Sequence, residues 1–405
     1  MNTPDIPVST QCRALVDCDS FFAWCEVARH PELRGQCVCV GREEDIIVAS
    51  TYEAKARWVK TGTPAREAKR ILGKDIVLIK PDMHYYQETS KKIMTLLAGE
   101  ANDIEVYSVD EAFIDITHHL AIAGNPDERY AQRASAIQHR IRTELGISVS
   151  IGVAPTRILA KICAWLQKPF GIVAHTTASS IHRMIEHMPL TTIPFISHKR
   201  ASRLPHCHTV RDFLDAPLHY IQDIMGGSWT KLRYEMHGTN AITLKKPSHQ
   251  KMIERTRSFH PNFTSDKQLV RTYLMQNFER AYRDLITSKG TIKTLRISFR
   301  LKNFRRCQQV FSFPWHTADR EILLSKVKEL FELIFNPRES YRTTGITLSD
   351  ISYITNQPSL FEQSTTSQKI YQTIDKLNEK FGKVLVTPAT NVKALESDDR
   401  GNAFG

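Results

Sequence analysis

Carboxylates interrupt apolar segments at two places that lie far apart in the chain. Residues 13–18 form a short apolar run with Asp17 near its end, and the pair Asp110 and Glu111 divides the apolar runs 104–109 and 112–116. Short apolar runs of this kind predict buried strands. A carboxylate without a partner is costly inside a buried strand. If these strands lie side by side, the three carboxylates converge.

Two interpretations of these carboxylates are open at this point. In the first, Asp17 and Asp19 are solvated loop residues and the Asp110-Glu111 pair caps a turn. In the second, the side chains are oxygen ligands for magnesium, as metal-assisted phosphoryl transfer requires. The position of the acidic residues within apolar strands favours the metal site.

The order of the expected elements predicts an α+β fold with several domains. The first part reads strand, helix, strand, strand, helix, strand, which is typical of a ferredoxin-like sheet, and a small basic insert interrupts it. A helical module broken by Pro189, Pro194, Pro205 and Pro217 follows, and then a second α+β region. The expected strands are 13–18, 37–40, 46–50, 104–109, 112–116, 149–153, 255–259, 294–301, 308–313 and 344–349, and the expected helices are 52–72 with a break at 61–64, 83–97, 129–145, 156–166, 267–287 and 318–335.

Positive charge is concentrated in one domain-sized segment. The formal net charge of the 405 residues is +12, and residues 245–355 hold 21 Lys and Arg against 10 Asp and Glu. This concentration favours nucleic-acid binding over a role in solubility alone. In the strand expected at 294–301, a period of two places Arg296 and Arg300 on one face, where they could track a phosphate backbone.

Other residue patterns point to few further sites. The eight cysteines are scattered without a Cys-x-x-Cys pair, which indicates reduced thiols, and His206, Cys207 and His208 fit a surface turn better than a zinc site. The chain shows no signal peptide and no apolar run long enough to cross a membrane. We therefore expect a cytoplasmic protein.

Two segments resemble the palm motifs of the Y-family of DNA polymerases. They are Val16-Asp17-Cys18-Asp19-Ser20-Phe21-Phe22-Ala23 and Tyr107-Ser108-Val109-Asp110-Glu111-Ala112-Phe113, in the family's order and separation. The resemblance implies low-fidelity, template-directed translesion synthesis in a bacterial, nucleoid-associated enzyme. It implies that Asp17, Asp110, Glu111 and the Cys18 carbonyl hold two Mg²⁺ ions, for which Mn²⁺ could substitute. It also implies that Phe22 is a steric gate against ribonucleotides.

The same resemblance divides the chain into domains. It implies a palm at 12–30 and 79–171, fingers at 31–78, a helical thumb at 172–240, a linker at 241–250, a DNA-binding little finger at 251–355 and a tail at 356–405.

Three further residues resemble the family's nucleotide-binding positions. Tyr52 and Lys55 belong to a finger motif that contacts the incoming triphosphate, and Lys161 belongs to a lysine motif on a palm helix. Two departures from the family pattern concern glycine: Trp58 stands where glycine is frequent, and the thumb hairpin 193–198 has none. We expect Lys199, Arg200 and Arg203 to compensate there with DNA contacts.

The tail resembles a sliding-clamp binding peptide at Gln357, Leu360 and Phe361. The expected partners are primer-template DNA, deoxynucleoside triphosphates, a sliding clamp and, if the chain resembles the polymerase V catalytic subunit more than polymerase IV, accessory proteins. Three rival functions are a catalytically inactive scaffold bound to the clamp, an RNA-binding module and a nuclease. The scaffold predicts loss of the carboxylates, and the RNA module predicts an aromatic strand motif that is missing. A nuclease would leave Phe22 and the nucleotide-binding residues without a role.

Overall fold

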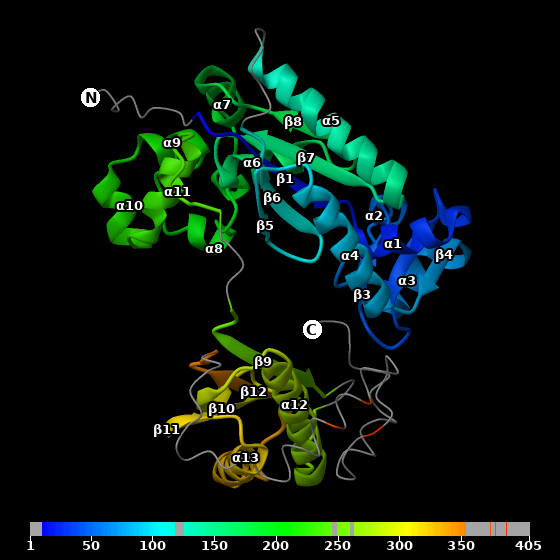
Figure 1. Cartoon of the computed structure of the whole chain (residues 1–405), viewed down its shortest axis with the longest axis vertical. Coiled ribbons are helices and arrows are strands. Elements are labelled where there is room, and N and C mark those ends of the chain that lie inside the picture. The colour runs from blue at the N-terminus through cyan, green and yellow to red at the C-terminus, as the bar shows by residue number, and fades with distance from the viewer. Residues whose placement is uncertain are drawn as a thin grey trace. The chain divides into compact units, whose positions relative to one another are not determined.

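The chain forms two compact units, Met1–Pro247 and Ser248–Gly405, here called the first and the second unit (Figure 1). The computed structural model describes residues 10–117, 125–244, 249–259 and 263–353, together with 373, 377 and 386. The predicted clamp residues Gln357, Leu360 and Phe361 lie outside the described residues. The mixed α+β class is confirmed, whereas the finer domain boundaries stay a prediction.

A five-stranded sheet forms the centre of the first unit. Its strands are β1 (Arg13–Cys18), β5 (Asp103–Val106), β6 (Glu111–Asp115), β7 (Val149–Ala154) and β8 (Ile172–Ala174), in the order β5-β6-β1-β7-β8. β1 pairs antiparallel with both β6 and β7, and β8 is added in parallel to β7. The order β7-β1-β6-β5 is that of a ferredoxin-like sheet, as the sequence predicts.

Alternate residues of β1 face the two sides of this sheet. Ala14 and Val16 belong to a core that includes residues of α1 (Phe21–Arg29), α4 (Met83–Ala98) and α5 (Pro126–Leu145), whereas Leu15 packs with residues of α6 (Arg157–Leu166). The period of two therefore directs Asp17 to the α6 side. Gly152 lets α6 approach closely, because a Cβ there would lie 2.1 Å from backbone atoms of the helix.

A small three-stranded sheet forms the insert between α1 and α4. Its strands are β2 (Cys37–Gly41), β3 (Ile47–Ser50) and β4 (Ile76–Ile79), and its helices are α2 (Tyr52–Ala56) and α3 (Ala65–Leu72). The break predicted within 52–72 is present, because Ala56 and Ala65 bound two separate helices. The sequence analysis missed β4, which pairs in parallel with β2 through only four residues.

The helical module contains five short helices: α7 (Ala178–Ile185), α8 (His198–Ala201), α9 (Val210–Asp215), α10 (Leu218–Met225) and α11 (Ser228–Met236). Pro217 occupies the N-cap position of α10, where its fixed φ and missing N–H are tolerated. Thr177 and Thr209 form capping boxes at the starts of α7 and α9. Local capping signals therefore explain how so short a helix as α9 has a defined start.

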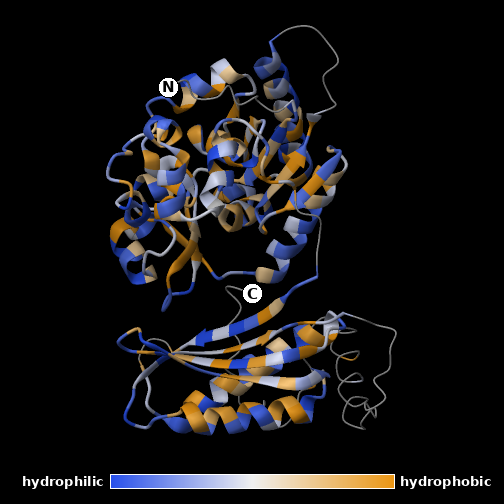
Figure 2. Ribbon diagram, turned by 90° about the vertical axis from the view of Figure 1, so that its left-hand side faces the viewer, coloured by the Kyte–Doolittle hydropathy of each residue, from blue (hydrophilic) through white to orange (hydrophobic). Residues whose placement is uncertain are grey.

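The second unit is a four-stranded antiparallel sheet with two helices. The strands are β9 (Met252–Ser258), β10 (Ile292–Leu301), β11 (Arg306–Thr317) and β12 (Tyr341–Ser349), in the order β11-β10-β12-β9. The helices α12 (Lys267–Thr287) and α13 (Arg320–Ile334) lie on one side of the sheet (Figure 2). They share a core with Leu295, Ile297 and Phe299 of β10. Arg296 and Arg300 alternate with these residues and thus belong to the opposite face.

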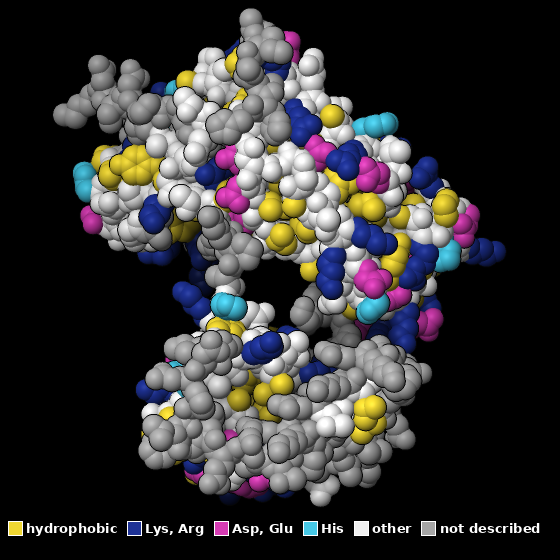
Figure 3. All heavy atoms as spheres, viewed as in Figure 1, with side chains coloured by type: hydrophobic (Ala, Val, Ile, Leu, Met, Phe, Trp, Pro, Cys, Tyr) yellow, Lys and Arg dark blue, Asp and Glu magenta, His cyan; other side chains and the backbone are white. Residues whose placement is uncertain are grey.

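Charges are mixed over the first unit. Residues 1–244 hold 28 Lys and Arg against 27 Asp and Glu. On the face of this unit shown in Figure 3, cations and carboxylates lie interspersed, and exposed ion pairs such as Arg57–Asp75 at 2.6 Å occur. Exposed pairs contribute only about 0–1 kcal/mol to stability. Among the residues that the structure describes, no helix combines the length and apolar character needed to span a bilayer.

Candidate active site

Pairing of β1 with β6 brings the predicted acidic residues together. Asp17 lies directly opposite Glu111 in the antiparallel register, and the Cys18 N–H donates to the Asp110 carbonyl at 2.8 Å. Directly opposed residues project from the same face of a sheet with neighbouring side chains. Asp17 is only 7% exposed and Asp19 is fully buried. The interpretation of Asp17 and Asp19 as solvated loop residues is therefore wrong.

Each of the three carboxylates has its own polar partner. Lys168 Nζ lies 2.5 Å from Asp17 Oδ1, and Lys161 Nζ lies 2.7 Å from Glu111 Oε2. The Ser108 hydroxyl donates to Asp110 at 2.5 Å. With the side chains in these positions, no group of three metal-ligating residues is preformed within the described part of the chain.

The site carries more negative charge than its environment favours. Burial raises the pKa of Asp17 to about 6, Lys168 opposes this rise, and Glu111 and Asp110 add to it. Carboxylates so placed require a positive partner. Magnesium prefers oxygen ligands that include one or two carboxylates, so this donor set fits a divalent cation. The two lysines supply the positive charge in the arrangement seen.

Asp19 anchors the segment that carries Lys168. Its carboxylate accepts hydrogen bonds from the hydroxyls of Ser148 at 2.7 Å and Ser150 at 2.8 Å, and from the Phe170 N–H at 2.9 Å. Three donors satisfy a buried carboxylate that would otherwise be costly. Asp19 thus ties the start of β7 and the segment after α6 to the end of β1.

The sequence analysis missed Lys168 as a site residue. Its partner Asp17 lies 151 positions earlier in the chain. No local pattern marks a lysine that follows a helix as a partner for so distant a carboxylate. The only signal was the second carboxylate of the Asp17-Cys18-Asp19 segment, which the structure connects to the Lys168 segment.

The two adjacent phenylalanines of α1 have different environments. Phe21 is buried in the core of the first unit. Phe22 is half-buried, and its ring stacks on Tyr86 with centroids 4.6 Å apart and planes 16° apart. Stacking fixes the orientation of the Phe22 ring. Its role as a steric gate stays a prediction.

Tyr52 and Lys55 lie together beside the first acidic motif. Lys55 Nζ lies 2.6 Å from the Ser20 hydroxyl and 4.3 Å from the centre of the Tyr52 ring. Burial lowers the pKa of Lys55, and the nearby Lys168 lowers it further. Burial also raises the pKa of the Tyr52 hydroxyl, which stays protonated as a hydrogen-bond donor. Lys55, Lys161 and Lys168 are therefore three cations around one group of carboxylates.

Left-handed backbone occurs in both segments that lack the glycine of the family pattern. Trp58 has φ +67° and is 78% exposed, and Phe195 in the thumb hairpin has φ +75°. Glycine adopts such conformations without steric cost, whereas other residues pay about 1–2 kcal/mol. Two of the expected compensating cations have partners within the helical module: Arg200 donates to the Phe195 carbonyl at 2.7 Å, and Arg203 donates to the Ile224 carbonyl.

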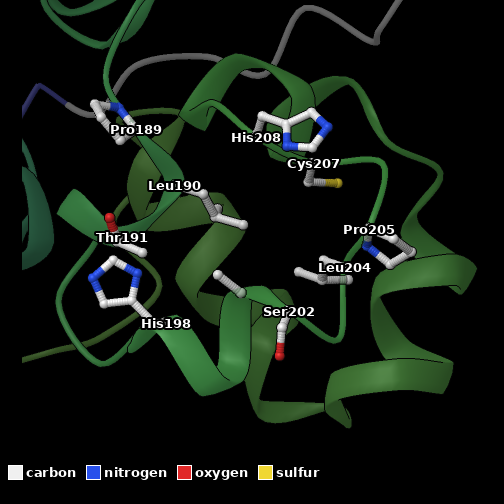
Figure 4. Close-up of a pocket in the computed structure, with 10 residues that line it drawn as sticks. Pro189, Leu190, Thr191, His198, Ser202, Leu204, Pro205, Cys207 and His208 are labelled. Carbon is white, nitrogen blue, oxygen red and sulfur yellow. The ribbon is translucent and has the colours of Figure 1, made fainter.

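A pocket of about 280 Å³ lies in the helical module, away from the acidic residues (Figure 4). Leu190 and Leu204 form its apolar wall, and His198, Cys207 and His208 also line it. Cys207 is buried, so the surface turn expected at 206–208 is only partly correct. No metal-ligating group of three forms here either among the described residues.

Comparison with known proteins identifies the family of this chain. Residues 16–164 match the model of the impB/mucB/samB family, and residues 250–366 match that family's C-terminal domain. DNA polymerase IV of Desulfatibacillum aliphaticivorans is 26% identical, over 93% of this chain and 96% of the relative. DNA polymerase IV 1 of Bacillus subtilis is 25% identical, over 96% of this chain and 95% of the relative.

Solved structures agree as well. A Y-family DNA polymerase chimera of Dbh and Dpo4 matches with a TM-score of 0.72 and 25% identity, over 84% of this chain and 99% of the chimera. An insertion ternary complex of Dbh DNA polymerase matches with a TM-score of 0.56, 25% identity and the same coverage. The two family models together match more than half of the sequence. The chain therefore belongs to the impB/mucB/samB family and is a member of the Y-family of translesion DNA polymerases.

Proposed function

We propose that this chain extends DNA primers opposite damaged template bases by a two-metal nucleotidyl transfer at Asp17, Asp110 and Glu111. One observation carries the proposal: Asp17 and Glu111 are cross-strand partners, and each contacts a lysine. Buried carboxylates and lysines together are the groups that a metal-bound triphosphate requires. Template DNA and deoxynucleoside triphosphates are the expected substrates, since the related Dbh structure is an insertion ternary complex.

Asp17, Asp110, Glu111 and the Cys18 carbonyl would hold Mg²⁺ or Mn²⁺. Bound there, the ions would lower the pKa of the primer 3′-hydroxyl and neutralise the leaving pyrophosphate. Lys161 and Lys168 would exchange their carboxylate partners for phosphate oxygens when the nucleotide enters. Lys161 and Lys168 would therefore offset the charge of their carboxylate partners in the free site and attract phosphate in the loaded site.

Phe22, Tyr52 and Lys55 would position the nucleotide. Lys55 binds a hydroxyl at 2.6 Å in the free protein and has the reach to donate to a phosphate instead. Tyr52 would add a neutral hydroxyl donor. The ring of Phe22, held by Tyr86, would exclude a 2′-hydroxyl by close packing.

The second unit would bind the DNA backbone through its open sheet face, and the tail would bind a sliding clamp through Gln357, Leu360 and Phe361. Phosphate contacts carry no sequence information, which suits an enzyme that accepts any template. Accessory proteins of the polymerase V type would be further partners of the tail. The chain would act in the SOS response while bound to the clamp.

Primer extension by the purified full chain tests the proposal. We expect extension of a primer opposite an intact and a damaged template base only when Mg²⁺ or Mn²⁺ is present. Gel-shift binding of the same primer-template, measured in parallel without metal, separates loss of chemistry from loss of binding. A chain that binds DNA but never extends it under any metal condition would be a scaffold, and the proposal would fail.

A further inference from the structure

A group of aromatic rings and cations lies at one end of the sheet of the second unit. We call it the phenylalanine–cation cluster and define it by Phe263, Phe304, Arg300, Lys302 and Arg342. The guanidinium carbon of Arg342 lies 4.7 Å from the ring centre of Phe304 and 5.8 Å from that of Phe263. Arg300 lies 5.0 Å from Phe304, and Lys302 lies 5.4 Å from Phe263. The five side chains therefore form one continuous group.

Phe304 is held in solvent by a strained turn. It follows β10, has φ +66° and is 57% exposed, and its N–H donates to the Leu301 carbonyl at 2.9 Å. A left-handed conformation costs an ordinary residue about 1–2 kcal/mol. Burial of the ring does not offset this cost. Strain of this kind tends to accumulate where a segment has a binding role.

The cations of the cluster differ in their partners from the neighbouring arginines. Within the described residues, Arg300, Lys302 and Arg342 form no ion pair with a carboxylate, although each lies near a ring. Their neighbours differ, because Arg305 pairs with Glu339 at 3.0 Å and Arg306 with Glu254 at 3.5 Å. The cluster thus combines exposed π-faces with an uncompensated positive field.

We propose that the phenylalanine–cation cluster binds single-stranded DNA, with unpaired bases stacked on Phe304 and Phe263 and phosphates bound by Arg300, Lys302 and Arg342. Single-strand binding sites combine these two features: aromatic rings for any base and cations along the backbone. Duplex DNA offers only its backbone to such a surface, because its bases are stacked on one another. The exposed rings therefore favour an unpaired strand.

The inference depends on the proposed function only for the source of the strand, which would be unpaired template. The binding itself needs no primer, nucleotide or metal ion. The cluster site can therefore be tested whether or not the chain extends primers.

Binding of a fluorescent oligothymidylate of about ten nucleotides to the full chain tests the proposal, since site sizes are roughly 4–16 nucleotides. We expect Phe304→Ala to weaken binding about 5- to 150-fold without changing its salt dependence, because stacking contributes about 1–3 kcal/mol per base. Arg300→Ala should instead reduce the slope of log K against log salt by about 0.7. Leu333 is an apolar residue on α13 with a similar exposure, so Leu333→Ala is the matched control and should bind as the unmodified chain does.

Photocrosslinking locates the site independently. An oligonucleotide with 5-iododeoxyuridine should crosslink to the peptide that contains Phe304, and excess unlabelled single strand should compete better than duplex of equal length. Unchanged affinity of a Phe304→Ala protein that melts at the normal temperature would overturn the proposal. Equal loss of duplex and single-strand binding in that variant would also overturn it, because stacking on unpaired bases would then not be the interaction.

Discussion

The candidate sites of the two units use lysine and arginine in different ways. In the first unit Lys161 and Lys168 contact buried carboxylates at 2.7 and 2.5 Å. In the second unit Arg300 and Lys302 lie over aromatic rings in solvent and have no carboxylate partner within the described residues. A cation that contacts a carboxylate can exchange this partner for a phosphate when a substrate enters. A cation without one binds any phosphate that approaches, so the first arrangement suits chemistry and the second suits affinity.

Removing one carboxylate should separate these two roles most clearly. We expect Asp110→Asn to reduce primer extension by on the order of a thousandfold or more, about 4 kcal/mol of transition-state stabilisation, because it removes charge without changing shape. Primer-template binding should stay within a factor of about two, because the proposed contacts to the DNA backbone do not involve Asp110. Single-turnover extension rates and gel-shift affinities measure the two effects.

A matched control for this variant is Asp103→Asn. Asp103 is an exposed carboxylate on β5, and within the described residues its one side-chain hydrogen bond is accepted from the N–H of Ile104. Its extension rate should equal that of the unmodified chain. If Asp110→Asn extends primers at a similar rate, Asp110 is not a metal ligand. The carboxylates of the first unit would then have no catalytic role that distinguishes it from the second unit.

Aromatic rings also differ between the units, since Phe22 is packed against Tyr86 and Phe304 is open to solvent. We expect Phe22→Ala to raise the efficiency of ribonucleotide relative to deoxynucleotide incorporation by roughly ten- to hundredfold, because the cost of forcing extra atoms into a packed site is about 1–3 kcal/mol. The ratio of kcat/KM for the two substrates measures this change.

The alternative to a steric gate is that Phe22 has only a structural role in the core. It predicts a lower melting temperature and an unchanged sugar preference. Phe304→Ala provides the comparison in the second unit, because an exposed ring distant from the sugar should leave the ribonucleotide ratio unaltered. A folded Phe22→Ala protein with the original ratio would remove the gate assignment.

Local patterns in the sequence predicted what depends on neighbouring residues. The short apolar runs at 13–18 and 112–116 predicted β1 and β6, and the acidic residues that interrupt these runs predicted that Asp17 and Glu111 lie close together. The helix predicted at 267–287 was confirmed because its N-cap Asp266 and its long amphipathic pattern are both local.

Long-range contacts explain what was missed. β4 has only four residues and is defined by its parallel pairing with β2. Lys168 and Asp19 acquire their roles through partners about 130–150 positions away. A buried carboxylate that accepts hydrogen bonds looks the same in the sequence as a solvated one, so only the fold distinguishes them.

A substitution at Asp19 tests how the first unit positions Lys168. We expect Asp19→Asn to raise KM for the nucleotide by about tenfold and to change kcat less, because the amide loses one of the acceptors that fix the segment bearing Lys168, and each charge-assisted hydrogen bond contributes about 1.5–3 kcal/mol. The kinetic constants are compared at a temperature where both proteins are folded. If kcat and KM are unchanged, or if only the melting temperature falls, Asp19 is purely structural.

The smallest expected effect concerns a histidine of the helical module. His237 Nε2 is buried and has no hydrogen-bond partner within the described residues, and burial lowers the pKa of His237 to about 4, with Arg233, His182 and Arg211 lowering it further and Asp215 opposing them. The native state therefore binds fewer protons than the unfolded state between pH 6.5 and 4, so stability falls as the pH falls through this range.

We expect His237→Gln to reduce the loss of unfolding free energy between pH 7 and pH 5 by roughly 1–2 kcal/mol. Urea unfolding followed by tryptophan fluorescence measures this loss, since four of the five tryptophans (Trp24, Trp58, Trp165 and Trp229) lie in the first unit. His316 of the second unit is exposed on β11, so His316→Gln should leave the pH dependence as it is. If both variants lose stability between pH 7 and pH 5 as the unmodified chain does, burial of His237 does not control its protonation, and the difference in burial between His237 and His316 has no effect on stability.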